Sequence, residues 1–280
     1  MRNRLWLPAM ALLMACSTKA AAGLGEPIVL MWQVTGDEFA ADFAVLAKAG
    51  VNTVQSFSLS QQTQQYVDAY MDAAAKQKLG VIAFVGHFVE GKGETCALSE
   101  TGAAFVRRYA GHAGLAAWHS VDEPANHDVS KDCQRKVYAK LKELDPKRPV
   151  FLSINFTKQS EYDRYFAEDA FDVLDLHKYV NPGVGRGQRN LLTLFKSNRK
   201  RAYPVIVTLR AFNAPRKVKR LDMRPGTLFE QYRFFFEEQK VTRNIGFYGW
   251  RLAPNKGIKQ IDWMRTEFEE FAERKLKAPE

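Results

Sequence analysis

The chain has 280 residues, of which 46% are hydrophobic and 26% are charged. This composition is typical of a globular protein with a full core, and no run reaches the ~20 apolar residues of a membrane-spanning helix. The formal net charge of +10 favours anionic partners such as acidic glycans, cell-wall polymers or lipid head groups. No nucleic-acid recognition motif is present, so nucleic acid is not expected as a partner.

The first residues form a basic and apolar leader. Arg2 and Arg4 precede the apolar segment 5–15, an order typical of a secretory signal. Removing residues 1–15 takes away two positive charges and leaves +8. We therefore predict that the mature protein is exported and still basic.

The leader ends in Leu13-Met14-Ala15-Cys16, which resembles the lipobox of bacterial lipoproteins. The resemblance implies a signal peptide over residues 1–15, a lipid-modified Cys16 and a tether over residues 16–25. It also implies a lipid anchor in the outer membrane, with the folded part facing the periplasm or the cell surface. The alternative is a plain signal peptide that is cut within residues 20–22.

Apolar runs then alternate with amphipathic stretches through the rest of the chain. Eight runs have the length of strands: Ile28 to Val34, Val51 to Leu59, Gly80 to Phe88, Leu115 to Glu123, Pro149 to Phe156, Phe171 to Val180, Pro204 to Phe212 and Asn244 to Leu252. Strands separated by helices pair in parallel, so the pattern predicts an α/β fold, a single (β/α)8 TIM barrel over residues 26–280. An open doubly wound sheet is the alternative, but no glycine-rich phosphate loop follows the first run.

Polar and aromatic residues stand near the end of nearly every predicted strand. The carboxyl ends of barrel strands form the active face of this fold. The residues placed there are Gln33, Thr35, Ser56, His87, Asp122, Glu123, Asn155, His177, Tyr179, Arg210, Tyr248 and Trp250. Together they predict a substrate pocket.

The fourth run ends in Trp118-His119-Ser120-Val121-Asp122-Glu123-Pro124, which resembles the barrel superfamily of glycoside hydrolases. The resemblance implies that Glu123 is the general acid, with Asp122 as its companion, and that the substrate is a polysaccharide or oligosaccharide. Desolvation of Glu123 beside aromatic side chains is expected to raise its pKa. Two groups of substrate-binding residues are expected: the sugar-stacking Trp118, Tyr179, Tyr248 and Trp250, and the polar Gln33, His87, Asn155, His177 and Arg210.

In the retaining members of that superfamily, the seventh strand ends in a glutamate that acts as the nucleophile. The seventh predicted strand of this chain carries Arg210 and no carboxylate. A retaining glycosidase uses two carboxyl groups ~5–5.5 Å apart, and an inverting one places them ~6.5–9.5 Å apart. Three possibilities remain open: a second acid supplied by Asp122, Asp175, Glu90 or Asp37; assistance by a substrate group; or a barrel that only binds glycan. A metal site at His87, His177 and Glu123 is disfavoured because the first strand lacks His-x-His, so no metal or cofactor is expected.

Two further features complete the expectations. Cys96 and Cys133 are left for a disulfide in an oxidising compartment, or are two unrelated thiols. A basic segment from Arg216 to Arg224 follows the seventh strand, and indicates an anionic glycan near the pocket, a solvated loop or a lipid contact. We expect the protein to be a monomer.

Overall fold

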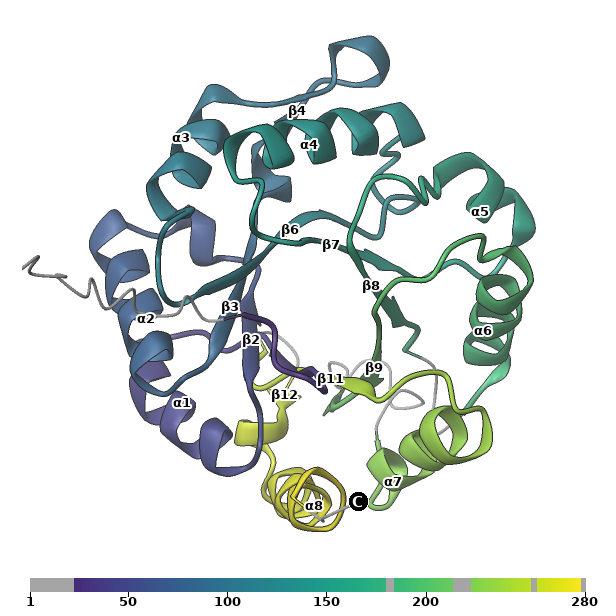
Figure 1. The fold of residues 1–280 in the computed structure, drawn as a ribbon. Coiled ribbons are helices and arrows are strands. Elements are labelled where there is room, and N and C mark those ends of the chain that lie inside the picture. The colour runs from purple at the N-terminus through teal and green to yellow at the C-terminus, as the bar shows by residue number, and fades with distance from the viewer. Residues whose placement is uncertain (1–22, 180–183, 214–222, 253–255, 278–280) are drawn as a thin grey trace, which may run out of the picture.

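The computed structural model of the protein describes residues 23–179, 184–213, 223–252 and 256–277. Eight strands close into a barrel that is surrounded by helices (Figure 1). Their order around the barrel is β1-β11-β9-β8-β7-β6-β3-β2, and every neighbouring pair is parallel. The predicted single (β/α)8 barrel is therefore confirmed, and the doubly wound sheet is excluded.

Each barrel strand lies within one of the eight predicted apolar runs. The strands are β1 (Val29–Trp32), β2 (Thr53–Ser56), β3 (Gly80–Phe84), β6 (Leu115–Asp122), β7 (Val150–Ile154), β8 (Val173–His177), β9 (Val205–Arg210) and β11 (Asn244–Tyr248). The helices are α1 (Phe39–Lys48), α2 (Gln64–Lys76), α3 (Glu100–Tyr109), α4 (Lys131–Leu144), α5 (Gln159–Tyr165), α6 (Arg186–Asn198), α7 (Thr227–Tyr232) and α8 (Asp262–Phe271).

Alternation along the strands builds two separate apolar layers. In β1, Leu30 and Trp32 belong to the cluster inside the barrel, whereas Val29 and Met31 belong to the layer between strands and helices. This follows from the two-residue period of a strand. The inner cluster consists of Ile28, Leu30, Trp32, Ile82, Ala117, Phe151, Val173 and Ile206. This cluster lies inside the barrel toward the starts of the strands, and the polar residues at the ends of the strands lie beyond it.

The connection from β3 to α3 is a long excursion over one end of the barrel. It contains the short antiparallel pair β4 (Val89–Glu90) and β5 (Ala97–Leu98). A disulfide joins Cys96 beside β5 to Cys133 in the first turn of α4, with the two Cα atoms 5.3 Å apart. The expected pairing is therefore present, and it ties this excursion to α4.

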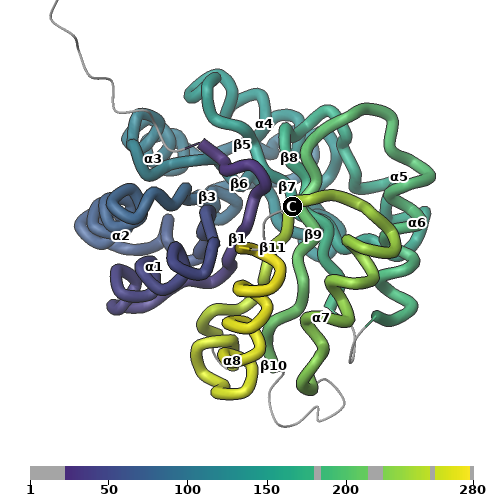
Figure 2. The backbone as a smooth tube through the Cα atoms, turned by 60° about the horizontal axis from the view of Figure 1, so that its bottom comes forward, coloured from purple at the N-terminus to yellow at the C-terminus, as the bar shows by residue number. Residues whose placement is uncertain are grey.

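The two ends of the barrel are distinct. We call the end where the strands begin the amino-terminal pole, and the end where they finish the carboxyl-terminal pole. A second short pair, β10 (Phe212–Asn213) with β12 (Lys256–Gly257), lies at the carboxyl-terminal pole. Figure 2 shows the start of the described chain, in purple ahead of β1, and β10 on opposite sides of the barrel.

Several expectations fall outside this part of the chain. The predicted signal peptide, Cys16, most of the tether, and residues 216–222 of the basic segment are not among the described residues. None of the described helices has the length and apolar character needed to cross a membrane.

Candidate active site

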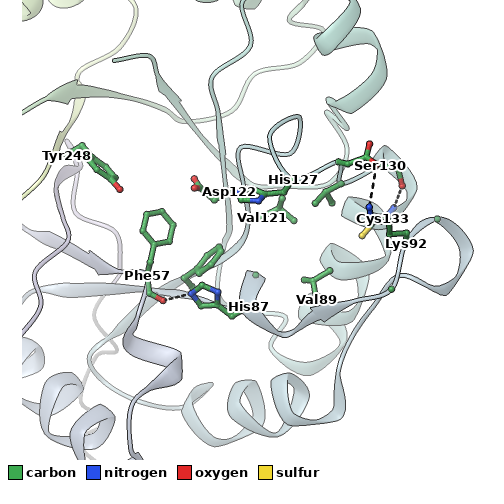
Figure 3. Close-up of a pocket in the computed structure, with 16 residues that line it drawn as sticks. Phe57, His87, Val89, Lys92, Val121, Asp122, His127, Ser130, Cys133 and Tyr248 are labelled. Atoms are coloured by element: carbon green, nitrogen blue, oxygen red, sulfur yellow. Dashed lines mark hydrogen bonds and ion pairs between the residues drawn. The ribbon is translucent and has the colours of Figure 1, made fainter. Parts of the chain in front are cut away.

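A cavity of about 540 Å³ opens at the carboxyl-terminal pole (Figure 3). It is bounded by the ends of β2, β3, β6 and β11 and by the loops after β3 and β6, and it reaches outward to the disulfide. Residues that line it include Phe57, His87, Val89, Lys92, Val121, Asp122, His127, Ser130, Cys133 and Tyr248. The cavity thus extends from the barrel axis to one side of the barrel.

The backbone at the end of β6 is irregular at two successive points. Pairing with β7 sets His119 opposite Phe151 but Val121 opposite Leu152, so Ser120 is an extra, bulged residue. In a regular strand Asp122 would point outward; the bulge turns it inward. Glu123 then has a φ of 43°, a left-handed conformation that costs roughly 1 kcal/mol for a residue with a side chain. Bulges and strained residues of this kind concentrate at functional sites.

A chain of hydrogen bonds holds the Glu123 carboxylate. Its Oε1 lies 2.6 Å from Nε2 of His177, and Nδ1 of the same ring lies 2.8 Å from Oδ2 of Asp175. Asp175 and His177 are two residues apart on β8 and therefore share its inward face. The other oxygen of Asp175 accepts from the hydroxyl of Thr208, which itself accepts from Nε1 of Trp32 at 3.1 Å. Four barrel strands thus fix the position of one carboxylate.

The geometry favours a doubly protonated His177. Both ring nitrogens face carboxylate oxygens, and both must donate if both carboxylates are ionised. Burial lowers the pKa of His177, but its hydrogen bonds to Asp175 and Glu123 and their charges raise it to about 10. Burial raises the pKa of Asp175, and the His177 cation opposes that rise. We therefore describe the trio as one imidazolium between two carboxylates.

The pKa of Glu123 is lowered, so the expectation of a raised pKa is wrong. Burial does raise it, but the hydrogen bond and charge of His177 outweigh burial, with further help from the amide of Asn126. The sequence motif gave no sign of this contact because His177 lies 54 positions away. Glu123 is held in its ionised form.

Asp122 behaves in the opposite way. Burial raises its pKa to about 6, and the charges of Glu123 and Asp175 add to the rise, while His177 and the hydroxyl of Ser153 oppose it. Asp122 lines the cavity, and 20% of its side chain remains exposed. Two adjacent carboxyl groups therefore have pKa values that are displaced in opposite directions, which is the usual mark of an acid and a base with separate roles.

Aromatic side chains form one wall beside these carboxyl groups. The ring of Tyr179 is stacked on His177 at 5.1 Å, and Tyr248 lies 5.0 Å from Tyr179. The amide of Gln33 donates to the Tyr248 hydroxyl at 3.4 Å. The hydroxyl of Tyr179 is buried and has no hydrogen-bond partner among the described residues. Faces and hydroxyls of this kind suit a sugar ring, which offers both C–H and O–H groups.

The remaining predicted polar residues lie around the same pole. Nε2 of His87 is 3.1 Å from the carbonyl oxygen of Phe57, and burial lowers the pKa of His87. Asn155 is buried directly after β7. Arg210 ends β9, where its Nε donates to the carbonyl of Phe212 at 3.0 Å and its guanidinium lies over that ring.

Two predicted stacking residues are wrong, because both tryptophans face the helices. Trp118 is fully buried in the outer layer, and its Nε1 donates to Asp145 at 2.9 Å. Trp250 is 2% exposed and packs against Phe268 of α8. Strand alternation puts Ala117 and His119 inside the barrel, so Trp118 between them must point outward.

Sequence reasoning missed several residues of the site. His119 is fully buried, with Nε2 3.1 Å from the Ser153 hydroxyl, and Trp32 packs against His119 and His177. Alternation along β1 and β6 is the signal that would have found Trp32 and His119. His127 lines the cavity from the loop after β6, and no pattern marked it.

The described side chains do not offer a metal centre. No group of three or more His, Cys, Asp or Glu in the described ranges is arranged to hold a metal ion. Both nitrogens of His177 are already engaged by carboxylates.

Comparison with solved structures finds the same barrel in glycoside hydrolases. A β-galactosidase from the psychrophilic Marinomonas ef1 has a TM-score of 0.56 at 12% identity, covering 88% of this chain and 59% of that one. A β-D-glucuronidase from Dictyoglomus thermophilum has a TM-score of 0.55 at 15% identity, covering 90% and 50%. A Bacteroides uniformis β-glucuronidase has a TM-score of 0.52 at 13% identity, covering 80% and 30%.

These likenesses show a shared fold. The chain spans from 30% to 59% of the length of these enzymes. No protein-family model matches the sequence, and a search of curated proteins returned no similar sequence. The protein is a (β/α)8 barrel of the architecture used by glycoside hydrolases, with a cavity at its carboxyl-terminal pole that Asp122 and Asp128 line.

Proposed function

We propose that this protein is a glycoside hydrolase of the bacterial cell envelope that acts on a polysaccharide, with Asp122 and Glu123 as its working pair. The observation that carries the proposal is the opposite displacement of their pKa values beside an aromatic-lined cavity. Its fold and its cavity at the strand ends agree with that class.

The pKa values of Asp122 and Glu123 support separate roles for the two residues. Asp122, with a pKa of about 6, holds a proton in weakly acidic solution and faces the cavity, so it donates that proton to the leaving oxygen. Glu123, ionised and fixed by His177, stabilises positive charge at the sugar carbon or accepts a proton from water. This exchanges the roles that the motif implied, in which Glu123 was the donor.

The sequence of β9 supports a mechanism that differs from that of the usual retaining glycosidases. None of the six residues of β9 is a carboxylate, so the usual retaining nucleophile is absent from that strand. Attack by water, or by a neighbouring group of the substrate, takes the place of a nucleophile on β9. The same observation favours the second candidate, a glycan-binding protein whose barrel has lost hydrolysis.

We further propose that the substrate is anionic and that the protein is a lipid-anchored outer-membrane protein. The net charge of +10 supports the first point, and the lipobox-like residues 13–16 support the second. The barrel begins at residue 29, which leaves room for both a leader and a tether.

The test is cleavage of acidic and neutral bacterial polysaccharides by the purified full chain in mild detergent. Asp122→Asn and Glu123→Gln are compared with Glu143→Gln, a matched control on the exposed surface of α4. We expect each site variant to lose at least ~100-fold in rate, since a positioned acid or base contributes about 10²–10⁴, and the control to be unchanged. The configuration of the first sugar released identifies a retaining or an inverting path.

Three results would change the proposal. If only Glu123→Gln is inactive, the donor is Glu123, as the motif implied. If no glycan is cleaved but one is bound by parent and variants alike, the protein is a receptor. If no glycan is cleaved or bound, the proposal is wrong.

A further inference from the structure

The amino-terminal pole carries a set of exposed, unpaired lysines. Lys78, Lys147, Lys200 and Lys240 lie in the loops after α2, α4, α6 and α7, each of which leads to the start of the next strand. All four are exposed, and none forms an ion pair with another described residue. The last turns of α1 and α2 also hold lysines, but the helix dipole accounts for those.

Two of these lysines occupy positions where the backbone favours glycine. Lys78 has a φ of 59° and Lys240 a φ of 47°, both in the left-handed region that disfavours a residue with a side chain. Glycine would relieve that strain, yet lysine is present at both positions. The positive charge therefore stands at this pole in spite of a conformational cost.

The acidic residues of the same pole are largely engaged elsewhere. Asp172 pairs with Lys142, and Asp169 pairs with Arg135. Glu168 accepts from the backbone N–H of Lys200. Glu26 is exposed at this pole and forms no ion pair with a described residue, so it offsets part of the charge of the four loop lysines, which stay in excess.

The amino-terminal pole also has a hollow at the strand starts, and this hollow is partly apolar. A depression of about 960 Å³ at the strand starts is lined by apolar side chains, among them Leu24, Ile28, Pro149 and Pro204, and also by the charged Glu26, Asp172 and Arg243. Exposed lysines at the same pole as a partly apolar hollow suit the head groups and upper acyl chains of a bilayer better than a soluble polyanion, which offers no apolar part.

We propose that the amino-terminal pole is a docking surface for an anionic phospholipid membrane. The described chain starts at residue 23 on this same pole, opposite β10 (Figure 2), so a tether from Cys16 would reach the membrane on the side of the lysines. The cavity at the other pole then faces away from the membrane, toward a polymer. This inference is independent of hydrolysis and stands even if the barrel only binds glycan.

The experiment measures binding of the full chain to vesicles of phosphatidylglycerol and phosphatidylcholine in equal parts, and of phosphatidylcholine alone. Cys16→Ala is used throughout, so that no acyl chain contributes. The test variant is Lys147→Glu/Lys200→Glu/Lys240→Glu. The matched control, Lys158→Glu/Arg224→Glu/Lys256→Glu, makes the same change of charge at exposed positions of the carboxyl-terminal pole.

We expect salt-sensitive binding to the anionic vesicles, weakened on the order of 10⁴-fold in the test variant, since each basic residue near an anionic surface contributes about fivefold and each reversal also adds an opposing charge. The control should bind within a few fold of the parent. A milder variant, Lys147→Gln/Lys200→Gln/Lys240→Gln, should lose about half of that effect on a logarithmic scale. It serves as the test if the triple reversal alters the circular dichroism spectrum.

Other outcomes overturn the inference. Equal loss in both charge variants would assign the effect to net charge alone, and no parent binding at low salt would exclude the surface. Alginate provides a soluble polyanion for comparison. If the test variant loses alginate binding but keeps vesicle binding, the partner is a polymer and not a membrane.

Discussion

The site depends on how two adjacent carboxyl groups receive different surroundings. Neighbouring residues of a regular strand point to opposite faces, so Asp122 and Glu123 would normally be separated by the strand itself. The bulge at Ser120 and the left-handed backbone of Glu123 bring both to one mouth. There Asp122 meets a hydroxyl and Glu123 meets an imidazolium, which is enough to displace their pKa values in opposite directions.

At the residue scale, Asp122→Asn should change how stability depends on pH. A folded pKa of about 6 against an ordinary 3.8 means that the neutral carboxyl stabilises the fold fully below pH ~4, and that this contribution is lost as pH rises through ~6. Asparagine does not ionise. Between pH 4 and 8 the parent should therefore lose about 2–3 kcal/mol relative to the variant. Chemical denaturation at both pH values measures this, and a difference that does not vary with pH would contradict it.

The second residue-scale prediction concerns Asp175, a positioning residue that acts through His177. Asp175→Asn removes one of the two carboxylates that raise the His177 pKa to about 10, so that pKa should fall by at least about one unit. Titration of the imidazole by NMR measures it directly, without a substrate. Cleavage should also fall by about 10²-fold. Asp172→Asn, at the other pole, is the control and should leave the His177 titration unchanged.

At the element scale, the disulfide holds one side of the cavity. Cys96 belongs to the excursion after β3, and Cys133 lies in the first turn of α4 and lines the cavity. Removing a bridge between residues 37 positions apart should cost about 4 kcal/mol on the chain-entropy model. The double variant Cys96→Ser/Cys133→Ser tests this by denaturation. A reductant should lower the stability of the parent and leave that of the double variant unchanged.

The same bridge predicts a kinetic effect. The residues that it ties down line the outer part of the cavity, away from Asp122 (Figure 3). Loss of the bridge should therefore raise KM for a long glycan more than it lowers kcat, because binding in the outer cavity is weakened while the carboxyl groups stay in place. An equal loss with a substrate too short to reach the outer cavity would show that the bridge also supports the carboxyl groups.

The elements themselves are largely predictable from the sequence, and the inward direction of Asp122 is not. Each apolar run contains one barrel strand. A barrel strand is buried on both faces and therefore appears as a short continuous run of apolar residues, a signal that is local in the sequence. The bulge at Ser120 is not visible in the sequence, so the inward turn of Asp122 could not be derived. Trp118 differs from its predicted direction because the face of a strand residue depends on its odd or even position along the strand, and not on its distance from the end of the run.

At the scale of the whole molecule, the parallel strands give the barrel two unlike poles. The eight strands all run from the pole where the described chain starts to the pole that holds the cavity. Closure of the barrel was predictable from eight alternating units, because parallel strands require helical crossovers. The contact between Glu123 and His177 joins the end of β6 to β8 across β7. The two residues are 54 positions apart in the sequence, so no local sequence pattern predicts their contact.

The final prediction separates the two proposed attachments of the molecule to a membrane. If Cys16 is lipidated, its acyl chains hold the protein by apolar burial, which salt does not weaken, whereas the four lysines act through charge and are screened at high ionic strength. In cells, Cys16→Ala should therefore leave a membrane-associated fraction that a wash with 1 M salt, where screening reaches ~3 Å, releases. The parent should resist the same wash, and its intact mass should exceed that of the processed polypeptide by the acyl groups. With the lysine reversals added to Cys16→Ala, no membrane-associated fraction should remain even at low salt. If Cys16→Ala resists the salt wash as the parent does, and its intact mass shows that residues 1–15 have been removed, Cys16 is not the anchor and another segment takes that role.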